Sequence, residues 1–141
     1  IGIDIPISID VKDDAAFGII GNYRLNENNI WLCHPSLDVL ISHRAALPNF
    51  RLVNSVRLTK IKEGPERRAA SLAQHSIDAL NMHMTDWNGG LVALFHRFNI
   101  FCFGWNLQYP EVLTTGLRMG LDGIFSDWPD RASDAMRNVN G

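Results

Sequence analysis

The sequence predicts a parallel α/β fold of the (β/α)8 barrel type (TIM barrel), with about six β/α units present. Short apolar runs of strand length alternate with amphipathic segments of helix length. An open doubly wound sheet is the alternative, but no Gly-x-Gly-x-x-Gly turn follows an early strand. Several strands end on polar or aromatic residues, as in barrels, where the carboxyl ends of the strands carry the chemistry. These residues are Asp10, Lys12, His34, Asn81, Trp105 and Asp127. A closed barrel of this type needs two further units.

Six segments have the composition of strands. The first alternates aliphatic and polar residues with period two, so Asp10 and Lys12 share its polar face. The others are short and mostly apolar, as expected for parallel strands that are covered on both faces. The predicted strands are residues 5–12, 30–34, 50–54, 77–82, 100–105 and 123–126.

The segments between the strands carry helix start and stop signals. Asp86 is expected to cap one helix, and Pro110 suits the first turn of the next, which stops at Gly120 in a left-handed conformation. The helix over 65–75 is expected to turn Arg67 and Arg68 outward. The predicted helices are residues 37–47, 65–75, 86–97, 109–119 and 130–137. Residues 15–20 are a weaker helix because they contain glycine, and residues 22–29 are rich in turn formers.

Composition limits the possible functions. A chain of 141 residues holds one domain with a real core. A formal charge of −2 gives no reason to expect nucleic acid or an anionic membrane as partner, and no apolar run reaches the length of a membrane span. Cys33 and Cys102 lie in apolar runs without disulfide or metal spacing, which fits buried thiols in a reducing, cytoplasmic compartment. Because the first residue is Ile1 and not Met, we expect the chain to be part of a longer protein.

The candidate site residues lie at strand ends. The Asp10 carboxylate can ligate a hard divalent cation, and the Lys12 ammonium can neutralise a phosphoryl oxygen. The alternative is a structural ion pair in the barrel mouth. Trp105 is either a flat apolar wall for the carbon skeleton of a substrate or a core residue.

The histidines give weaker indications. His34 could act as an acid or base, but the sequence places no carboxylate beside it, and His83 stays undecided. Asp122 and Asp127 flank the last strand and are either ligands or loop and capping residues. The remaining histidines, expected to be surface or structural, are His43, His75 and His96.

Three segments together resemble the C-terminal part of the glycerophosphodiester phosphodiesterase family. Residues 105–108 (Trp-Asn-Leu-Gln) resemble the family's Trp-Thr-Val-Asn strand. Residues 120–129 (Gly-Leu-Asp-Gly-Ile-Phe-Ser-Asp-Trp-Pro) resemble its closing Gly-Val-Asp-Gly-Ile-x-Thr-Asp-x-Pro. Residues 10–12 (Asp-Val-Lys) resemble its Glu-x-Lys, although the acidic side chain is one methylene shorter.

This resemblance implies a (β/α)8 barrel that hydrolyses glycerophosphodiesters to glycerol 3-phosphate and an alcohol. In the family, a calcium or magnesium ion holds the phosphodiester, and two histidines serve as general acid and base. Carried over to this chain, Asp10 is a metal ligand, Lys12 stabilises the phosphoryl charge, and Trp105 packs on the glycerol. The implied partner is a small glycerophosphodiester.

The resemblance also implies that the chain lacks part of the barrel. The family's His-Arg-Gly motif, its Glu-x-Asp metal pair and its second histidine precede the Glu-x-Lys strand, and none is present here. We therefore interpret residues 1–141 as the C-terminal portion of the barrel domain, without its first two units, inactive alone and prone to associate through open sheet edges. A non-catalytic binding or assembly domain is one alternative. The other is an unrelated barrel enzyme in which Asp10 and Lys12 transfer protons.

Overall fold

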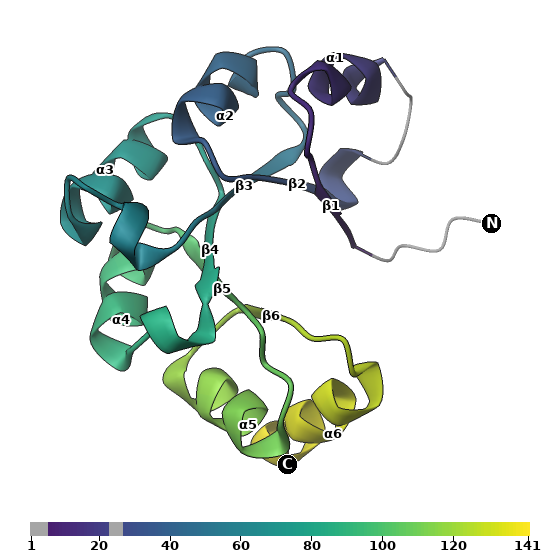
Figure 1. The fold of residues 1–141 in the computed structure, drawn as a ribbon, viewed down its shortest axis with the longest axis vertical. Helices are drawn as coiled ribbons and strands as arrows, with labels where there is room; N and C mark the ends of the chain where they lie inside the picture. The colour runs from purple at the N-terminus through teal and green to yellow at the C-terminus, as the bar shows by residue number, and fades with distance from the viewer. Residues whose placement is uncertain (1–5, 23–26) are drawn as a thin grey trace.

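The computed structural model describes residues 6–22 and 27–141, which fold into a curved sheet of six parallel strands with helices on its outer side (Figure 1). The strands stand in the sheet in their order along the chain, and each neighbouring pair is parallel. Their bounds are Ile7–Asp10 (β1), Ile30–His34 (β2), Arg51–Ser55 (β3), Ala79–His83 (β4), Phe101–Trp105 (β5) and Gly123–Phe125 (β6). The predicted partial (β/α)8 barrel is confirmed as an open half-barrel.

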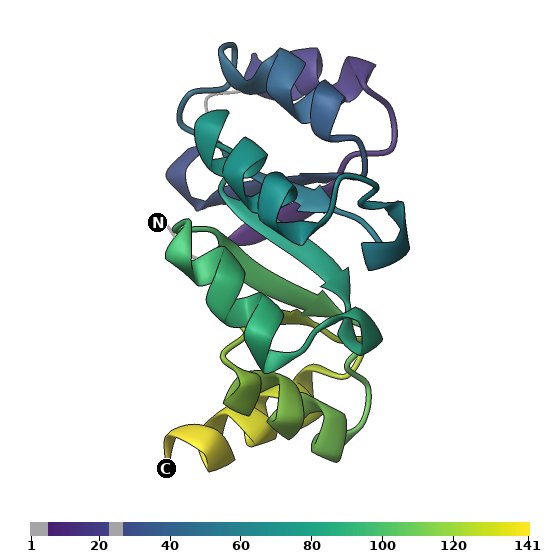
Figure 2. The same cartoon turned by 90° about the vertical axis from the view of Figure 1, so that its left-hand side faces the viewer.

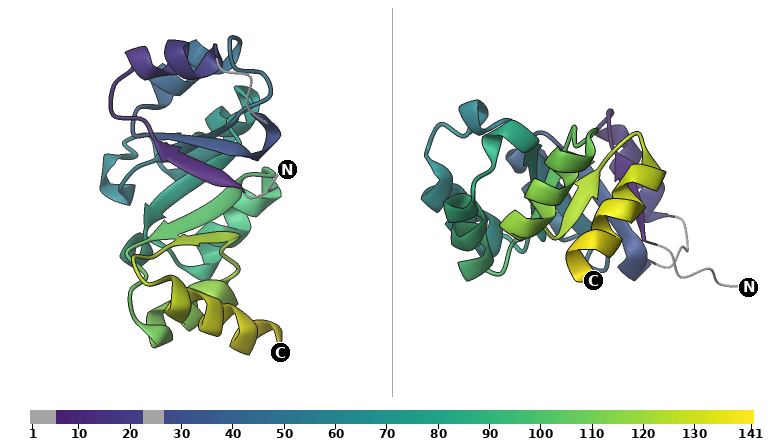
Figure 3. Two further views of the ribbon diagram at one scale, coloured as in Figure 1. Left: turned by 90° about the vertical axis from the view of Figure 1, so that its right-hand side faces the viewer. Right: turned by 90° about the horizontal axis from the view of Figure 1, so that it is seen from below.

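The two sides of the sheet differ in what covers them. Helices lie in front of the strands on the convex side (Figure 2). From the opposite side, β1, β5 and β6 face the viewer with no helix in front of them (Figure 3, left). Among the described residues β1 pairs only with β2, and β6 only with β5, so the sheet has two free edges.

Six α-helices alternate with the strands. Their bounds are Ala15–Gly21 (α1), Leu37–Arg44 (α2), Pro65–Gln74 (α3), Gly89–Arg97 (α4), Pro110–Met119 (α5) and Pro129–Asn140 (α6). Short 3-10 turns occupy Glu27–Asn29, Leu58–Lys60 and Met84–Asp86. The start and stop expected for α5 are confirmed: Pro110 is its first residue, and Gly120 ends it with φ 102°, a left-handed conformation that costs glycine little. No helix of the described residues is long and apolar enough to cross a membrane.

The structure confirms one uncertain detail of the sequence prediction and corrects others. Residues 15–20, the weaker helix, belong to α1, which is held by the fully buried ring of Phe17. Asn88 caps α4 by accepting a hydrogen bond from the Leu91 N–H at 2.9 Å, so the expected capping by Asp86 is wrong. The first strand is shorter than expected, and its predicted first residue, Ile5, lies outside the described residues, as do 23–26 in the predicted turn region.

The core lies between the strands and the helices. Alternate strand residues point outward to it, among them Leu32, Leu52, Leu80 and Cys102, and all four are fully buried. Helix residues such as Leu40, Leu72, Phe95 and Leu113 pack on the same cluster.

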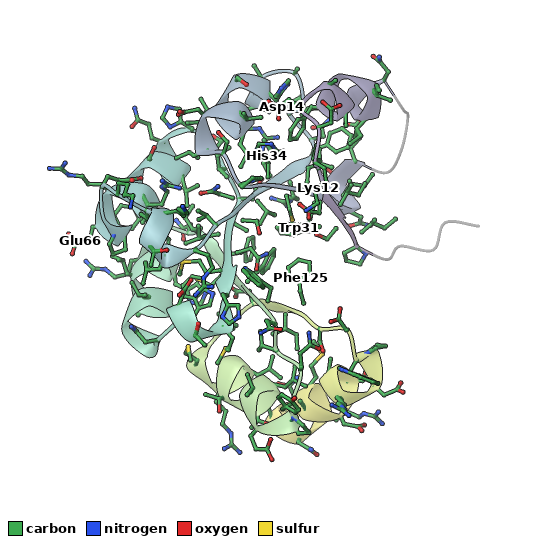
Figure 4. The ribbon with its side chains drawn as sticks, in the orientation of Figure 1. Lys12, Asp14, Trp31, His34, Glu66 and Phe125 are labelled. Atoms are coloured by element: carbon green, nitrogen blue, oxygen red, sulfur yellow. The ribbon has the colours of Figure 1, made fainter. Side chains whose placement is uncertain are left out.

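The inner face of the sheet is also apolar in its middle. Cys33, Val53 and Ala79 are buried there, with Trp31, Phe103 and Phe125 packed around them. Figure 4 shows Trp31 and Phe125 on the concave side of the sheet, with Lys12 above Trp31. The inner face therefore has the packed apolar middle that a barrel needs, and its polar groups gather at the carboxyl ends of the strands.

Candidate active site at the carboxyl ends of the strands

Asp10 and Lys12 meet at the carboxyl end of β1. The Lys12 ammonium donates a hydrogen bond to Asp10 Oδ2, so the two predicted site residues form an ion pair. Their side chains are 54% and 83% exposed, which keeps both accessible from solvent at the concave side. Screening by water makes such an exposed pair a weak contributor to stability, and either group can exchange its partner for a ligand.

Trp105 forms the wall of a pocket at the end of β5. The pocket has a volume of about 370 Å³ and is lined by Trp105, Asn106, Gln108, Ile124, Phe125, Ser126 and Asp127. Gln108 joins the two strand ends: its Nε2 donates to Asp127 Oδ2 at 2.9 Å, and its Oε1 accepts from the Asp127 N–H at 3.1 Å. Asp127 is thus held by Gln108, and the expected alternative of a helix-capping carboxylate is not what the structure has.

His83 lies beside Trp105 on the same rim. The two rings meet edge to face, with centroids 4.6 Å apart and an interplanar angle of 89°. His83 Nδ1 lies 2.7 Å from Thr85 Oγ1 and 3.2 Å from the Thr85 main-chain nitrogen. The side-chain amide nitrogen of Asn106, Nδ2, lies 2.9 Å from His83 Nε2. Both ring nitrogens are therefore engaged.

His34 has a carboxylate partner that sequence reasoning missed. Its Nε2 lies 2.9 Å from Asp14 Oδ1, and its Nδ1 accepts from the Ser36 N–H at 3.0 Å. Figure 4 shows His34 and Asp14 on the side of α1 and α2. The imidazole is buried, and its ring centroid lies 5.7 Å from that of Phe17 of α1. Asp14 could not be recognised because it precedes His34 by a whole helix. The arrangement is that of a structural histidine on the outer side of the sheet.

A buried arginine corrects another prediction. Arg68, expected to point outward, is only 9% exposed. Its Nη1 donates to Asn54 Oδ1 at 2.7 Å, and its Nε donates to Glu63 Oε1 at 2.5 Å. The hydrogen bond from Arg68 lowers the pKa of Glu63. The guanidinium thereby satisfies a buried amide on β3, a requirement that the local helical pattern does not reveal.

A second ion pair supports the wall of the pocket. The Arg57 guanidinium donates to both carboxylate oxygens of Asp86, at 2.7 Å from Nε and 3.1 Å from Nη2. Its Cζ lies 5.9 Å from the ring centre of Trp105. The hydrogen bond from Arg57 lowers the pKa of Asp86. The Asp86 carboxylate also accepts a hydrogen bond from the Leu58 N–H at 3.0 Å.

Beneath this rim lies one unsatisfied polar atom. Asn81 Nδ2 donates to Ser55 Oγ at 3.0 Å, but Asn81 Oδ1 is the one buried side-chain oxygen or nitrogen without a hydrogen-bond partner in the described part of the chain. A buried amide oxygen of this kind needs a donor from water or from a further group in the barrel interior.

Asp122, which the sequence left as either a ligand or a loop residue, lies away from this rim, and the two cysteines are buried thiols as expected. Asp122 precedes β6, at the amino ends of the strands, where it contacts His96 at 2.7 Å. Both cysteines are buried free thiols, and burial raises the pKa of each, that of Cys102 to about 12. The cytoplasmic setting expected from these thiols stays a prediction.

Solved structures of phosphodiesterases share this fold. A phosphodiesterase from Oleispira antarctica, in complex with the product sn-glycerol-3-phosphate, has a TM-score of 0.77 and 14% identity, covering 95% of this chain and 56% of that one. A glycerophosphoryl diester phosphodiesterase from Parabacteroides distasonis has a TM-score of 0.69 and 18% identity, covering 95% and 51%. A glycerophosphodiester phosphodiesterase from Agrobacterium tumefaciens has a TM-score of 0.66 and 14% identity, covering 91% and 54%.

The chain therefore spans about half the length of the solved structures that it matches. At these identities the likeness establishes the fold, which is the one that the sequence resemblance implies. No protein-family model and no curated protein sequence matches the chain.

Proposed function

We propose that this chain is the C-terminal portion of a glycerophosphodiester phosphodiesterase barrel, and that the whole protein hydrolyses glycerophosphodiesters to glycerol 3-phosphate and an alcohol. The observation that carries the proposal is the pocket beside Trp105, on the same rim as Lys12. The fold is shared with a phosphodiesterase that was solved with glycerol 3-phosphate, which supports this substrate class.

Trp105 and Lys12 have distinct roles in this proposal. Trp105 packs its flat ring against the carbon skeleton of the glycerol, and the polar lining of the pocket surrounds the hydroxyl groups. Lys12 leaves Asp10 and places its ammonium against a phosphoryl oxygen. A phosphodiester anion resists attack until positive charge neutralises its oxygens, so this contact strengthens as charge develops in the transition state.

Asp10 is proposed as one ligand of a calcium or magnesium ion. These cations take six or more oxygen ligands, counting water. In the part of the chain that the structure describes, the one group of three close metal-ligating side chains lies elsewhere, at His96, Cys102 and Asp122. The described residues around Asp10 therefore do not complete a cation site, and the missing ligands have to come from the rest of the whole protein.

The chain alone is proposed to be inactive. A general acid or base needs a ring nitrogen that faces the substrate, whereas both nitrogens of His34 and of His83 are engaged within the chain. The acid and base of the whole protein would accordingly come from outside these residues.

The test is release of glycerol 3-phosphate from a glycerophosphodiester, with and without a divalent cation, by this chain and by a chain extended upstream. Activity only in the longer chain, and only with the cation, supports the proposal in full. Activity in the short chain refutes the assignment of the acid and base and makes His83 and His34 the first candidates.

Activity in neither chain would favour a non-catalytic barrel domain that binds or assembles. An unrelated barrel enzyme, using the same two residues for proton transfer, is excluded if phosphodiesters are hydrolysed with a metal requirement.

A further inference from the structure

Three metal-ligating side chains meet at the amino ends of the strands, at the opposite end of the sheet from the candidate active site. A ring nitrogen of His96, Cys102 Sγ and a carboxylate oxygen of Asp122 all lie within 4.8 Å of one another. They come from the last turn of α4, from β5 and from the residue before β6. A pocket of about 280 Å³, which His96 and Asp122 line, gives access from solvent.

The main chain holds the carboxylate in place. Asp122 Oδ2 accepts a hydrogen bond from the Cys102 N–H at 2.8 Å and lies 2.7 Å from His96 Nε2. The imidazole and the carboxylate thus share one proton between two atoms that both serve as metal ligands. A metal ion that replaces this proton finds the carboxylate already oriented by its hydrogen bond to the main chain.

A second corner of the same sheet has the same backbone arrangement with other side chains. Asp78, before β4, accepts from the Leu52 N–H at 2.9 Å and pairs with Arg44 of α2 at 3.2 Å. Its own N–H donates to the Leu52 carbonyl, as that of Asp122 donates to the Cys102 carbonyl. Arginine and leucine cannot ligate a metal. This corner therefore shows that an aspartate can make the same main-chain hydrogen bonds without a thiol or an imidazole beside it. The main-chain hydrogen bonds of Asp122 therefore do not require the side chains of His96 or Cys102.

We propose that His96, Cys102 and Asp122 form a binding site for a borderline transition-metal ion, with Zn²⁺ as the fitting cation. One nitrogen, one sulfur and one oxygen ligand suit zinc, whereas calcium and magnesium require oxygen ligands. On binding, the Cys102 thiol releases its proton to solvent, and the imidazole proton moves from Nε2 to Nδ1. A water molecule from the adjoining pocket completes four ligands. This site does not depend on the proposed hydrolytic function.

Cobalt(II) tests the proposal, because a cobalt–thiolate bond produces a near-ultraviolet charge-transfer absorption. The 141-residue chain, reduced and free of chelator, is titrated with Co²⁺ and then with Zn²⁺. We expect an absorption that saturates at about one cobalt ion per chain, that zinc abolishes, and that excess calcium or magnesium leaves unchanged. Absence of the absorption overturns the proposal.

Variants locate the site. Cys102→Ser should abolish the absorption, and His96→Gln should weaken cobalt binding by more than about tenfold, since even outer-shell changes cost that much. Cys33→Ser is the matched control: its thiol is also buried but contacts Ser8 on the inner face, so the absorption should persist. An absorption that survives Cys102→Ser, or that disappears in Cys33→Ser, refutes the assignment. If Cys102→Ser fails to fold, His96→Gln still tests the site, because the His96 side chain is partly exposed and its replacement disturbs the core less.

Discussion

Arg57 and Asp86 tie the connection after β3 to the connection after β4. The two hydrogen bonds of this pair, 2.7 and 3.1 Å long, fix the guanidinium so that it also lies against Trp105. The side chain of Asp86 is only 10% exposed and additionally holds the Leu58 N–H. One carboxylate therefore stabilises two loops of the rim and, through Arg57, the position of the pocket wall.

Replacing Asp86 should lower stability in a pH-dependent way. The pKa of Asp86 is lowered in the folded chain, chiefly by the hydrogen bond from Arg57. The contribution of Asp86 to the free energy of unfolding is therefore complete above its unfolded pKa of about 3.9, and it is lost as the pH falls through the folded pKa. We expect Asp86→Asn to unfold at lower temperature than the wild type at pH 7, with the difference closing below about pH 4. Thermal unfolding followed by circular dichroism measures this. Asp134→Asn, in an ion pair that is exposed on both sides, is the control and should change little.

Trp105→Ala should impair substrate use by the upstream-extended protein. Losing a large apolar contact costs about 1–3 kcal/mol, which corresponds to a fall in kcat/KM of about 5- to 150-fold. Trp105→Phe retains a flat ring and should recover most of the loss. Steady-state kinetics with a glycerophosphodiester measure kcat/KM for both variants. An unchanged kcat/KM in Trp105→Ala would mean that the ring only packs against His83 and Arg57.

Lys12→Ala should mainly lower kcat. An ammonium that meets the developing phosphoryl charge acts in the transition state, and removal of such a donor costs about 100-fold or more. Lys60→Ala is the matched control, because Lys60 is an exposed lysine in the 3-10 turn after β3. Equal activity of the two variants would show that Lys12 serves only as the partner of Asp10.

Two glycines should respond oppositely to the same substitution. Gly18 lies inside α1, and a Cβ built there meets no atom within 4 Å, so Gly18→Ala should stabilise the chain by about 0.5–1 kcal/mol. Gly120 has φ 102°, so Gly120→Ala should destabilise it by about 1–2 kcal/mol. Urea unfolding of both variants measures the difference, and a stabilised Gly120→Ala would contradict the left-handed end of α5.

The free edges should make the chain associate. β1 and β6 each leave one row of backbone groups unpaired within the described sheet, and Ile7 and Phe101 on its rim are 54% and 43% exposed. We expect sedimentation coefficients that rise with concentration, and Ile7→Lys should reduce the effect by placing a charge on the edge strand. A monodisperse monomer at all concentrations would count against the interpretation of the chain as part of a larger barrel.

The sequence predicted the local structure where short-range signals determine it. The bounds of β2 match the apolar run 30–34, and Pro110 with Gly120 defines α5. The rim position of Trp105 also followed from the pattern, because parallel strands bring their carboxyl ends to one edge. The functional roles of Asp10, Lys12 and Trp105 stay predictions.

What the sequence could not show are pairs that lie far apart in the chain. Arg68 was assigned to the surface because its helical position is that of an outward residue, and only the fold brings Asn54 beneath it. Asp86 looked like a helix cap because Arg57, its partner, lies 29 residues earlier. Such contacts depend on which segments become neighbours in the fold, and no local periodicity encodes that.

The order of the strands has a consequence for how the chain acquires its structure. Since each strand from β2 to β6 pairs with its immediate predecessor in the chain, each new β/α unit packs against residues that were synthesised just before it. Chain segments that come together are separated by about one unit, which keeps the entropy lost on loop closure modest. The strand pairings can therefore form in the order of synthesis, one unit after another from β1 toward β6.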